Sequence, residues 1–187
     1  SAYRNFGRAG IGAVFGSKNL KGLVFRGGAR AAQFNSRSEL AEWNSTYANL
    51  SADEFSLIKP DLADQVKAAN QGKYFPSGYW VEGELIGWEG LVSELRSQKI
   101  ENGNLDYLSF NAFGGLCRLT NLKEIIKLVD LCSRLGLDPI SAGNLASFAA
   151  WARQKGKLDE APFYGRADSI ELFLESVATA KGEGALF

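Results

Sequence analysis

Residues 121–144 read NLKEIIKLVDLCSRLGLDPISAGN, and this stretch predicts the fold of the C-terminal half. Its apolar residues recur at the spacing that one face of a helix requires: Leu122, Ile125, Ile126, Val129, Cys132 and Leu135. Asn121 and Glu124 have the spacing of a helix start, and Gly136 suits the left-handed position just after a helix. We therefore expect a long helix that ends at Gly136.

A second helix is expected directly afterwards, over residues 141–155, with Gly156 as its end. Asp138 or Ser141 has the side chain to cap it. A helix start can also bind an anion through its free N–H groups and its dipole. The pattern therefore leaves Asp138 with two interpretations, a helix cap or part of a binding site.

A third helix is expected over residues 168–181. Asp168 and Glu171 have the spacing of a cap, and Gly182 follows the last periodic residue. Together the three helices predict a small helical array in this half of the chain.

Upstream, Ser36 and Glu39 form a capping box before apolar residues at helical spacing, and residues 61–70 and 89–99 are also expected to be helical. Residues 72–88 are aromatic and contain Gly and Pro, so we expect a strand and loop that lie over the core. Packing is the expected role of the aromatic side chains, and an exposed contact surface is the alternative. They are Phe75, Tyr79, Trp80 and Trp88.

Residues 1–30 are rich in glycine, and short strands are expected at about 11–15 and 20–26, joined by a turn at 16–19. The fold class expected for the chain is therefore α+β, with a β-containing N-terminal part and a mainly helical C-terminal part. The expected divisions are residues 1–35, 36–116 and 117–187.

The composition makes several classes of protein unexpected. The chain has 187 residues, of which 45% are hydrophobic, so it can bury a core and is not expected to be disordered. Its formal net charge is zero, with 21 basic and 21 acidic residues, which gives no reason to expect a nucleic-acid or membrane-surface partner. It has no transmembrane run and no secretory signal, so a cytoplasmic protein is expected. Because the sequence has no Met, Ser1 is not expected to be an initiator, and the chain is expected to be cut, processed or engineered.

Two further features limit the chemistry. The sequence has no His, which removes the commonest general base and the commonest metal ligand. Its two cysteines, Cys117 and Cys132, form no C-x-x-C site and are too few for a four-cysteine cluster. Cys132 also falls on the apolar face of its helix. The pattern therefore predicts no metal site made of side chains and identifies no catalytic residue.

A glycine-rich segment, GRAGIGAVFGSKNLK, occupies residues 7–21. Glycines let backbone N–H groups approach an anion closely, and Arg8 and Lys18 have the charge to neutralise a phosphate. The dinucleotide-binding pattern is met only loosely and no long helix follows, so a Rossmann unit is not expected. A tight β-hairpin whose glycines serve packing is the alternative.

Three segments resemble blocks of the tungsten-pterin aldehyde:ferredoxin oxidoreductase family. GRAGIGAVFGSKNLKGLVF is similar to that family's G-R-x-G-x-G-A-V-x-G-S-K-N-L-K block. LCSRLGLDPISAGNLASFAAWARQKGKL is similar to its block around G-L-D-x-I-S-x-G, and YGRADSIELFLESVATAKGEGALF resembles the segment that follows. The blocks occur in family order and cover more than a third of the chain.

The resemblance implies oxidation of an aldehyde to a carboxylic acid at a tungsten or molybdenum bis-pterin site, with electrons that leave through a [4Fe–4S] cluster to ferredoxin. In the family, pterin dithiolenes hold the metal. The resemblance also implies that Asp138 accepts hydrogen bonds from pterin N–H groups. The implied cofactor-binding residues are Arg8, Ala9, Gly10, Gly12, Lys18, Gly136, Leu137 and Asp138.

The sequence also departs from the family pattern. The family's C-x-x-C-x-x-x-C motif should lie in residues 86–116, which contain no Cys, so this chain does not support the [4Fe–4S] cluster. The family's D-x-x-G-L-D motif begins with an acid where this chain has Ser133. We therefore expect a truncated or degenerate member that is inactive by itself. The alternatives are a non-catalytic interaction or scaffold subunit, and half of a split enzyme completed by a partner chain. The interactions expected besides ferredoxin are a partner chain or self-association.

Overall fold

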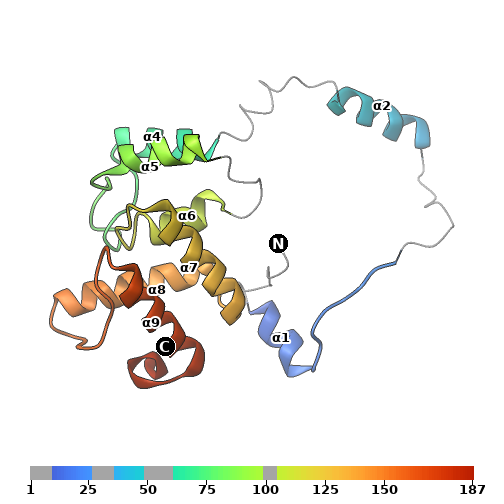
Figure 1. Cartoon of the computed structure of the whole chain (residues 1–187). Coiled ribbons are helices and arrows are strands. Elements are labelled where there is room, and N and C mark those ends of the chain that lie inside the picture. Colours follow the sequence, from blue (N-terminus) through green and yellow to red (C-terminus); the bar gives the residue numbers. More distant parts are fainter. Residues whose placement is uncertain (1–9, 27–35, 49–60, 99–104) are drawn as a thin grey trace. The chain divides into compact units, whose positions relative to one another are not determined.

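The computed structural model describes residues 10–26, 36–48, 61–98 and 105–187 (Figure 1). The regular structure in these ranges is helical. It consists of α1 (Ile11–Ser17), α2 (Arg37–Ala48), α4 (Leu62–Gln71), α5 (Trp88–Ser97), α6 (Tyr107–Phe113), α7 (Leu122–Leu135), α8 (Pro139–Gln154), α9 (Ala167–Thr179) and the 3-10 helix η1 (Gly182–Leu186). None of the described helices combines the length and the apolar character that crossing a bilayer demands.

The expected β-containing N-terminal part, and with it the α+β fold class, is wrong. Residues 11–15 lie within α1, and residues 20–26 form no strand. A strand satisfies its backbone groups by pairing with another strand, and within the described ranges no strand pairs with either segment. In a helical turn the backbone hydrogen-bonding groups pair within the segment itself. Here the Val14 N–H donates to the Gly10 carbonyl oxygen at 3.1 Å.

The expected turn at residues 16–19 is present, but it ends a helix rather than joining two strands. Asn19 has a left-handed φ of 55°. The Leu20 N–H donates to the Phe15 carbonyl oxygen at 2.9 Å, which is the closing hydrogen bond of a Schellman motif.

Residues 72–88 also differ from the expected strand and loop. They form turns, and their β structure is one isolated antiparallel bridge between Ser77 and Glu82. Phe75 is fully buried, as expected for a packing residue, whereas Trp80 is 62% exposed.

The contacts divide the described residues into two units. Helix α2 belongs to one unit, and helices α4 to α9 with η1 belong to the other. In α2, Ser36 Oγ accepts a hydrogen bond from the Glu39 N–H at 3.2 Å, which confirms the expected cap.

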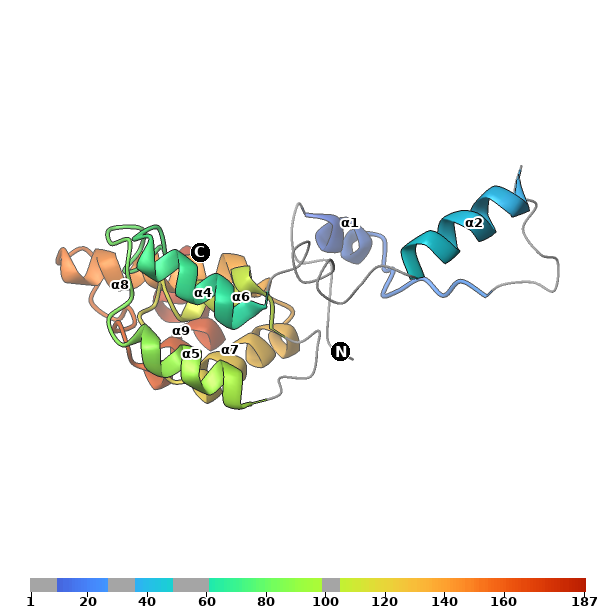
Figure 2. The same cartoon turned by 90° about the horizontal axis from the view of Figure 1, so that it is seen from above.

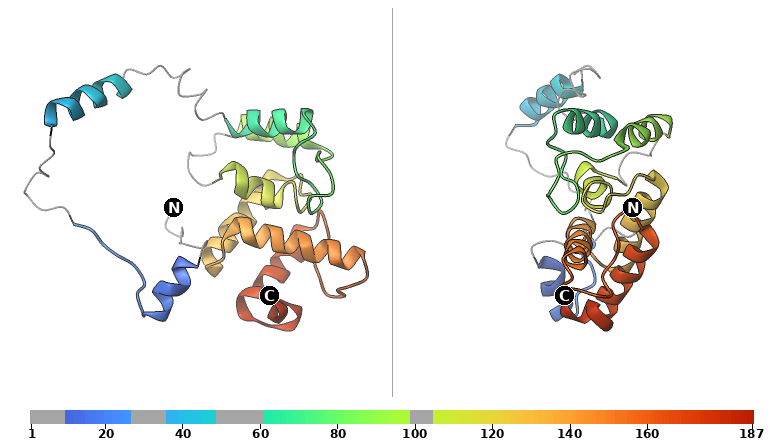
Figure 3. Two further views of the ribbon diagram at one scale, coloured as in Figure 1. Left: turned by 180° about the vertical axis from the view of Figure 1, so that it is seen from behind. Right: turned by 90° about the vertical axis from the view of Figure 1, so that its left-hand side faces the viewer.

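In the larger unit, α4 packs against α5, α6 packs against both α7 and α8, and α9 packs against α7, α8 and η1. Figures 2 and 3 show α4 and α5 side by side, and Figure 3 shows them at the opposite end of this unit from α9 and η1. The helical array expected for the C-terminal half is therefore confirmed, and α4 and α5 extend it.

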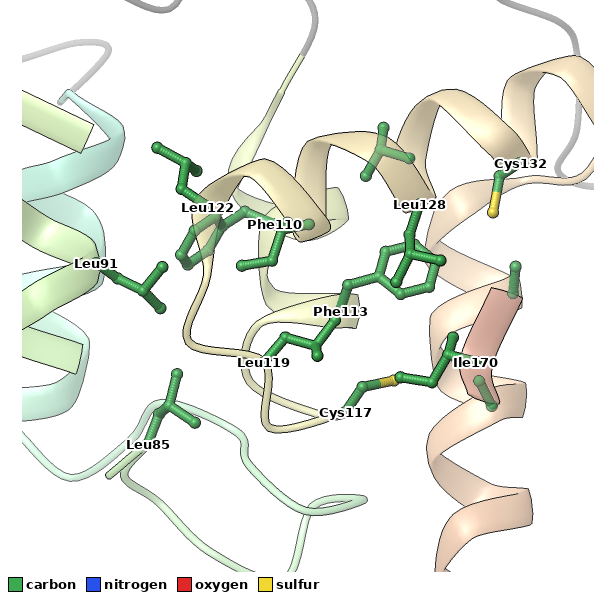
Figure 4. Packing of buried hydrophobic residues seen from close by; sticks show 14 of the residues in the cluster. Leu85, Leu91, Phe110, Phe113, Cys117, Leu119, Leu122, Leu128, Cys132 and Ile170 are labelled. Atoms are coloured by element: carbon green, nitrogen blue, oxygen red, sulfur yellow. The ribbon is translucent and has the colours of Figure 1, made fainter. Parts of the chain in front are cut away.

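One hydrophobic cluster joins these helices (Figure 4). Burying a large apolar side chain of this kind contributes about 1.5–3 kcal/mol. The largest fully buried side chains are Phe75, Phe110, Phe113, Leu85, Leu91, Leu116, Leu119, Leu122, Ile125, Leu128, Ile170 and Leu174. The apolar face predicted for α7 points into this cluster, with Leu122, Ile125 and Cys132 completely enclosed.

The expected start and end of α7 are confirmed. Asn121 caps it, because its side-chain oxygen accepts a hydrogen bond from the Lys123 N–H at 3.0 Å. Gly136 follows the helix with a left-handed φ of 76°.

The other two C-terminal helices are present with different boundaries. Helix α8 begins earlier than expected, at Pro139, because proline fits the first position of a helix. The expected cap of α9 by Asp168 and Glu171 is wrong, since the helix begins after Arg166 and Asp168 lies in its first turn. Gly182 does not end α9; it begins η1.

Candidate cofactor-binding site

The link between α7 and α8 brings together three of the expected site residues, Gly136, Leu137 and Asp138. The left-handed Gly136 reverses the chain, and the Leu137 N–H donates to the Cys132 carbonyl oxygen at 2.8 Å. Leu137 is partly buried and packs against the hydrophobic cluster. The link is therefore fixed by the helix end on one side and by core packing on the other.

Asp138 is the N-cap of α8, so the capping interpretation of its role is confirmed. Its Oδ2 accepts hydrogen bonds from both the N–H and the hydroxyl of Ser141, at 2.8 and 2.7 Å. A carboxylate at this position also interacts favourably with the positive end of the helix dipole. These contacts fix the carboxylate in the half-buried link, between the two helices.

Ser133, which stands where the family motif has an acid, plays a purely helical role. Its hydroxyl donates to the Val129 carbonyl oxygen one turn earlier, at 3.2 Å. The hydroxyl oxygen keeps its acceptor lone pairs, but it lacks the negative charge and the second oxygen that a carboxylate would offer a ligand.

The glycine-rich segment supplies the other expected site residues. Gly10 has a left-handed φ of 72° and directly precedes α1, Gly12 lies within α1, and Lys18 follows its last residue. All three are exposed. The remaining two expected residues, Arg8 and Ala9, lie outside the described ranges.

Both cysteines are buried and free, which suits packing rather than metal binding. Burial raises the pKa of the Cys117 thiol, and the Cys117 Sγ lies 3.4 Å from the Gly143 carbonyl oxygen. Burial, followed by the nearby Asp138 charge, raises the pKa of Cys132 to about 12. Metals bind the thiolate form, which such pKa values disfavour. The described residues contain no cluster of three or more acidic or thiol side chains placed to hold a metal ion.

An exposed aromatic residue lies against the same helix as Asp138. The indole N–H of Trp80 donates to the Asn144 Oδ1 on α8 at 3.0 Å. The next residue back, Tyr79, packs its ring against Phe148 and Trp151 of the same helix. The sequence indicated aromatic character here but gave no signal that Trp80 and Asn144 would meet.

Arg118 forms a junction between three loops. The sequence did not predict this role. It has a left-handed φ of 58°. Its Nη2 lies 2.7 Å from Glu82 Oε1, and its guanidinium carbon lies 4.8 Å from the centre of the Tyr164 ring. Gly78 lies against the same guanidinium, because a Cβ there would fall 2.5 Å from Nη2. No local sequence pattern predicts such a junction, because its residues are distant in the sequence.

Comparison with known proteins places these features in a family. The family model described as "Aldehyde ferredoxin oxidoreductase, domains 2 & 3" matches residues 88–187, which is more than half of the chain. This range includes helices α5 to α9 and the whole α7–α8 link.

Individual relatives agree with that match. The chain is 26% identical over 216 residues to the tungsten-containing aldehyde ferredoxin oxidoreductase of Pyrococcus furiosus. It is 26% identical over 217 residues to the protein of the same name from Thermococcus kodakarensis, and 24% identical over 220 residues to that from Pyrococcus horikoshii. These matches cover 97–98% of this chain and 36% of each relative.

The chain thus spans about a third of the length of these relatives. The family match covers most of the residues in the hydrophobic cluster of this chain. The G-L-D segment lies within the family match, and the alignments with the relatives extend over nearly the whole chain. The chain belongs to the aldehyde ferredoxin oxidoreductase family.

Proposed function

We propose that this protein takes part in the oxidation of an aldehyde to a carboxylic acid. The reaction would use a tungsten or molybdenum bis-pterin cofactor, with ferredoxin as the electron acceptor. The observation that carries the proposal is the α7–α8 link, where Gly136, Leu137 and the fixed carboxylate of Asp138 lie together within the family match. The relatives' names, which specify tungsten and ferredoxin, support the cofactor and the acceptor.

The residues of this link fit a pterin. A pterin ring presents N–H donors, and the ionised carboxylate of Asp138 is an acceptor only. Charge-assisted hydrogen bonds of this kind are among the stronger ones in proteins. Open space lies beside Gly136, because a Cβ added there would meet nothing within 4 Å.

In this proposal Gly136, Leu137 and Asp138 face one pterin, and the glycine-rich segment faces the other. The residues proposed for the second pterin are Arg8, Ala9, Gly10, Gly12 and Lys18. When bound, the cofactor supplies the redox chemistry. The chain's contribution is to bind and orient the ring through Asp138, whose own position Ser141 fixes.

The residues do not fit a [4Fe–4S] cluster. Such clusters require four cysteine thiolates, whereas the sequence has two cysteines and both are buried with raised thiol pKa values. We therefore propose no electron transfer through a cluster held by this chain, and we propose that the chain by itself does not catalyse the oxidation.

The test is the metal and pterin content of the purified protein. Cells expressing the chain would be grown with tungstate and molybdate, and the protein would be analysed for tungsten, molybdenum and iron, and for pterin as its fluorescent oxidation product. We expect pterin together with tungsten or molybdenum, and iron far below cluster stoichiometry. A folded protein with neither pterin nor either metal would contradict the proposal.

A variant pair makes the test specific to the site. Asp138→Ala is expected to lower the pterin content strongly, because it removes the proposed acceptor. Asp130→Ala removes an acid of α7 that instead pairs with Arg134 one turn later, at 3.0 Å. This control is expected to keep the pterin content of the parent protein.

A second candidate function is a non-catalytic interaction subunit, which the exposed residues of the 74–88 region favour. Four large apolar or aromatic side chains are more than 60% exposed there: Tyr74, Trp80, Val81 and Ile86. Residues of this type are common in protein interfaces. A metal-free, pterin-free chain that forms a stable complex with another polypeptide on size exclusion would favour this candidate, and a loaded chain in such a complex would favour a split enzyme.

A further inference from the structure

Trp80 is exposed and yet held in one orientation. Trp80 is 62% exposed, and its indole N–H donates to Asn144 Oδ1 at 3.0 Å. Tyr79 and Trp80 both have left-handed backbone angles, with φ of 56° and 66°. Bulky residues rarely adopt this conformation, and such residues cluster where a site requires a particular arrangement.

Packing along α8 explains how this conformation persists. The Tyr79 ring centre lies 5.3 Å from that of Phe148 and 5.7 Å from that of Trp151. Tyr79 thus anchors the turn toward the middle of α8, while Trp80 reaches Asn144, nearer the start of the helix. The anchor leaves much of the Trp80 ring available to a ligand.

Asp138 and Trp80 form hydrogen bonds with two residues of α8 that lie three positions apart, Ser141 and Asn144. Asn144 follows Ser141 by three residues, and residues at that spacing are neighbours on a helix surface. Ser141 binds Asp138, and Asn144 binds Trp80. Asp138 and Asn144 are separated by about 9 Å along the helix axis, at 1.5 Å per residue.

The geometry points to Trp80 as a stacking residue for the pterin whose N–H groups Asp138 is proposed to bind, an inference that rests on the proposed function. A pterin is a flat heteroaromatic ring, and an exposed indole offers such rings an offset-stacked face. Asp138 would bind the edge of the ring, and Trp80 would support its face. Asn144 would be a positioning residue that fixes the indole.

The experiment measures the pterin content per folded protein in Trp80 variants of the whole chain. Trp80→Ala is expected to lower it about tenfold, within the range that stacking on an aromatic side chain contributes to binding. Trp80→Phe keeps a ring and is expected to retain most of the pterin. The control is Trp43→Ala, because Trp43 is 61% exposed but lies on α2 in the other unit.

The outcomes separate this inference from the proposed function. If Trp80→Ala retains the pterin content of the parent, the stacking role is overturned and the proposed function stands. If the parent itself holds no pterin or metal, both fall. Circular dichroism would verify folding, and if Trp80→Ala does not fold, comparison of Trp80→Leu with Trp80→Phe gives the same decision because only the latter keeps the ring.

Discussion

Gly143 on α8 lies directly against Ala112 on α6: a Cβ added at Gly143 would fall 2.7 Å from the Ala112 Cβ and 2.7 Å from its carbonyl oxygen. Separations this short are not tolerated between real side chains. The absence of a Cβ at residue 143 therefore allows the two helices to pack closely, beside the link that carries Asp138.

Gly143→Ala is expected to lower the free energy of unfolding by about 1–3 kcal/mol, because overpacking forces buried helices apart. Urea denaturation followed by circular dichroism would measure the change. The matched control is Gly90→Ala in the first turn of α5, where a Cβ meets nothing within 4 Å. It is expected to be neutral or to stabilise by about 0.5–1 kcal/mol, since Ala is the better helix former. Equal effects at the two positions would contradict the packing argument.

Asp138→Ala is expected to destabilise the fold by about 1 kcal/mol, because it removes the N-cap of α8. Asp138→Asn keeps a capping oxygen and is expected to retain most of the stability. Urea midpoints of the two variants and the parent would be compared at pH 7. Unchanged stability in Asp138→Ala would show that the Ser141 contacts contribute nothing to the helix start.

Stability is expected to fall as the pH rises above about 9. Burial raises the pKa of Cys132 from 9.0 to about 12. The folded state therefore keeps a proton that the unfolded state loses, so the contribution is complete below pH 9 and is lost progressively between pH 9 and 12. Urea midpoints measured from pH 7.5 to 10.5 should decline less steeply in Cys132→Ala than in the parent. Parallel declines would contradict the assignment to this thiol.

Arg118→Ala is expected to lower the free energy of unfolding by about 1–2 kcal/mol, because it removes both a partly shielded ion pair with Glu82 and a cation–π contact with Tyr164. Arg166→Ala serves as the control, since its pair with Asp168 is more than 60% exposed on both sides. That variant should show no measurable change in urea midpoint. A loss in Arg166→Ala as large as in Arg118→Ala would mean that burial of the ion pair is not what matters.

The sequence predicted correctly those features whose hydrogen bonds and apolar spacing lie within one short segment. The apolar spacing of α7, its Asn121 cap and its Gly136 end all act within a few residues, and each is present as predicted. The two interpretations of Asp138 also came from local pattern, and the structure confirmed the cap.

Contacts between segments that are distant in the sequence could not be predicted from the sequence. The hydrogen bond from Trp80 to Asn144 joins residues 64 positions apart, and the Arg118 junction joins three loops. Helix α6 was not predicted either; it has seven residues, too few for a clear periodic pattern, and five of them are buried by neighbouring helices.

The sequence by itself determined the helices of the C-terminal half and the position of an acid between two of them, because helical hydrogen bonds and caps close within one turn. The tertiary structure decided that no strand within the described ranges pairs with residues 11–15, which form helix α1 through local hydrogen bonds, and that Trp80 lies beside α8. Those outcomes depend on which groups meet across the chain, since a strand requires a partner strand and an aromatic side chain remains exposed only where no other element covers it.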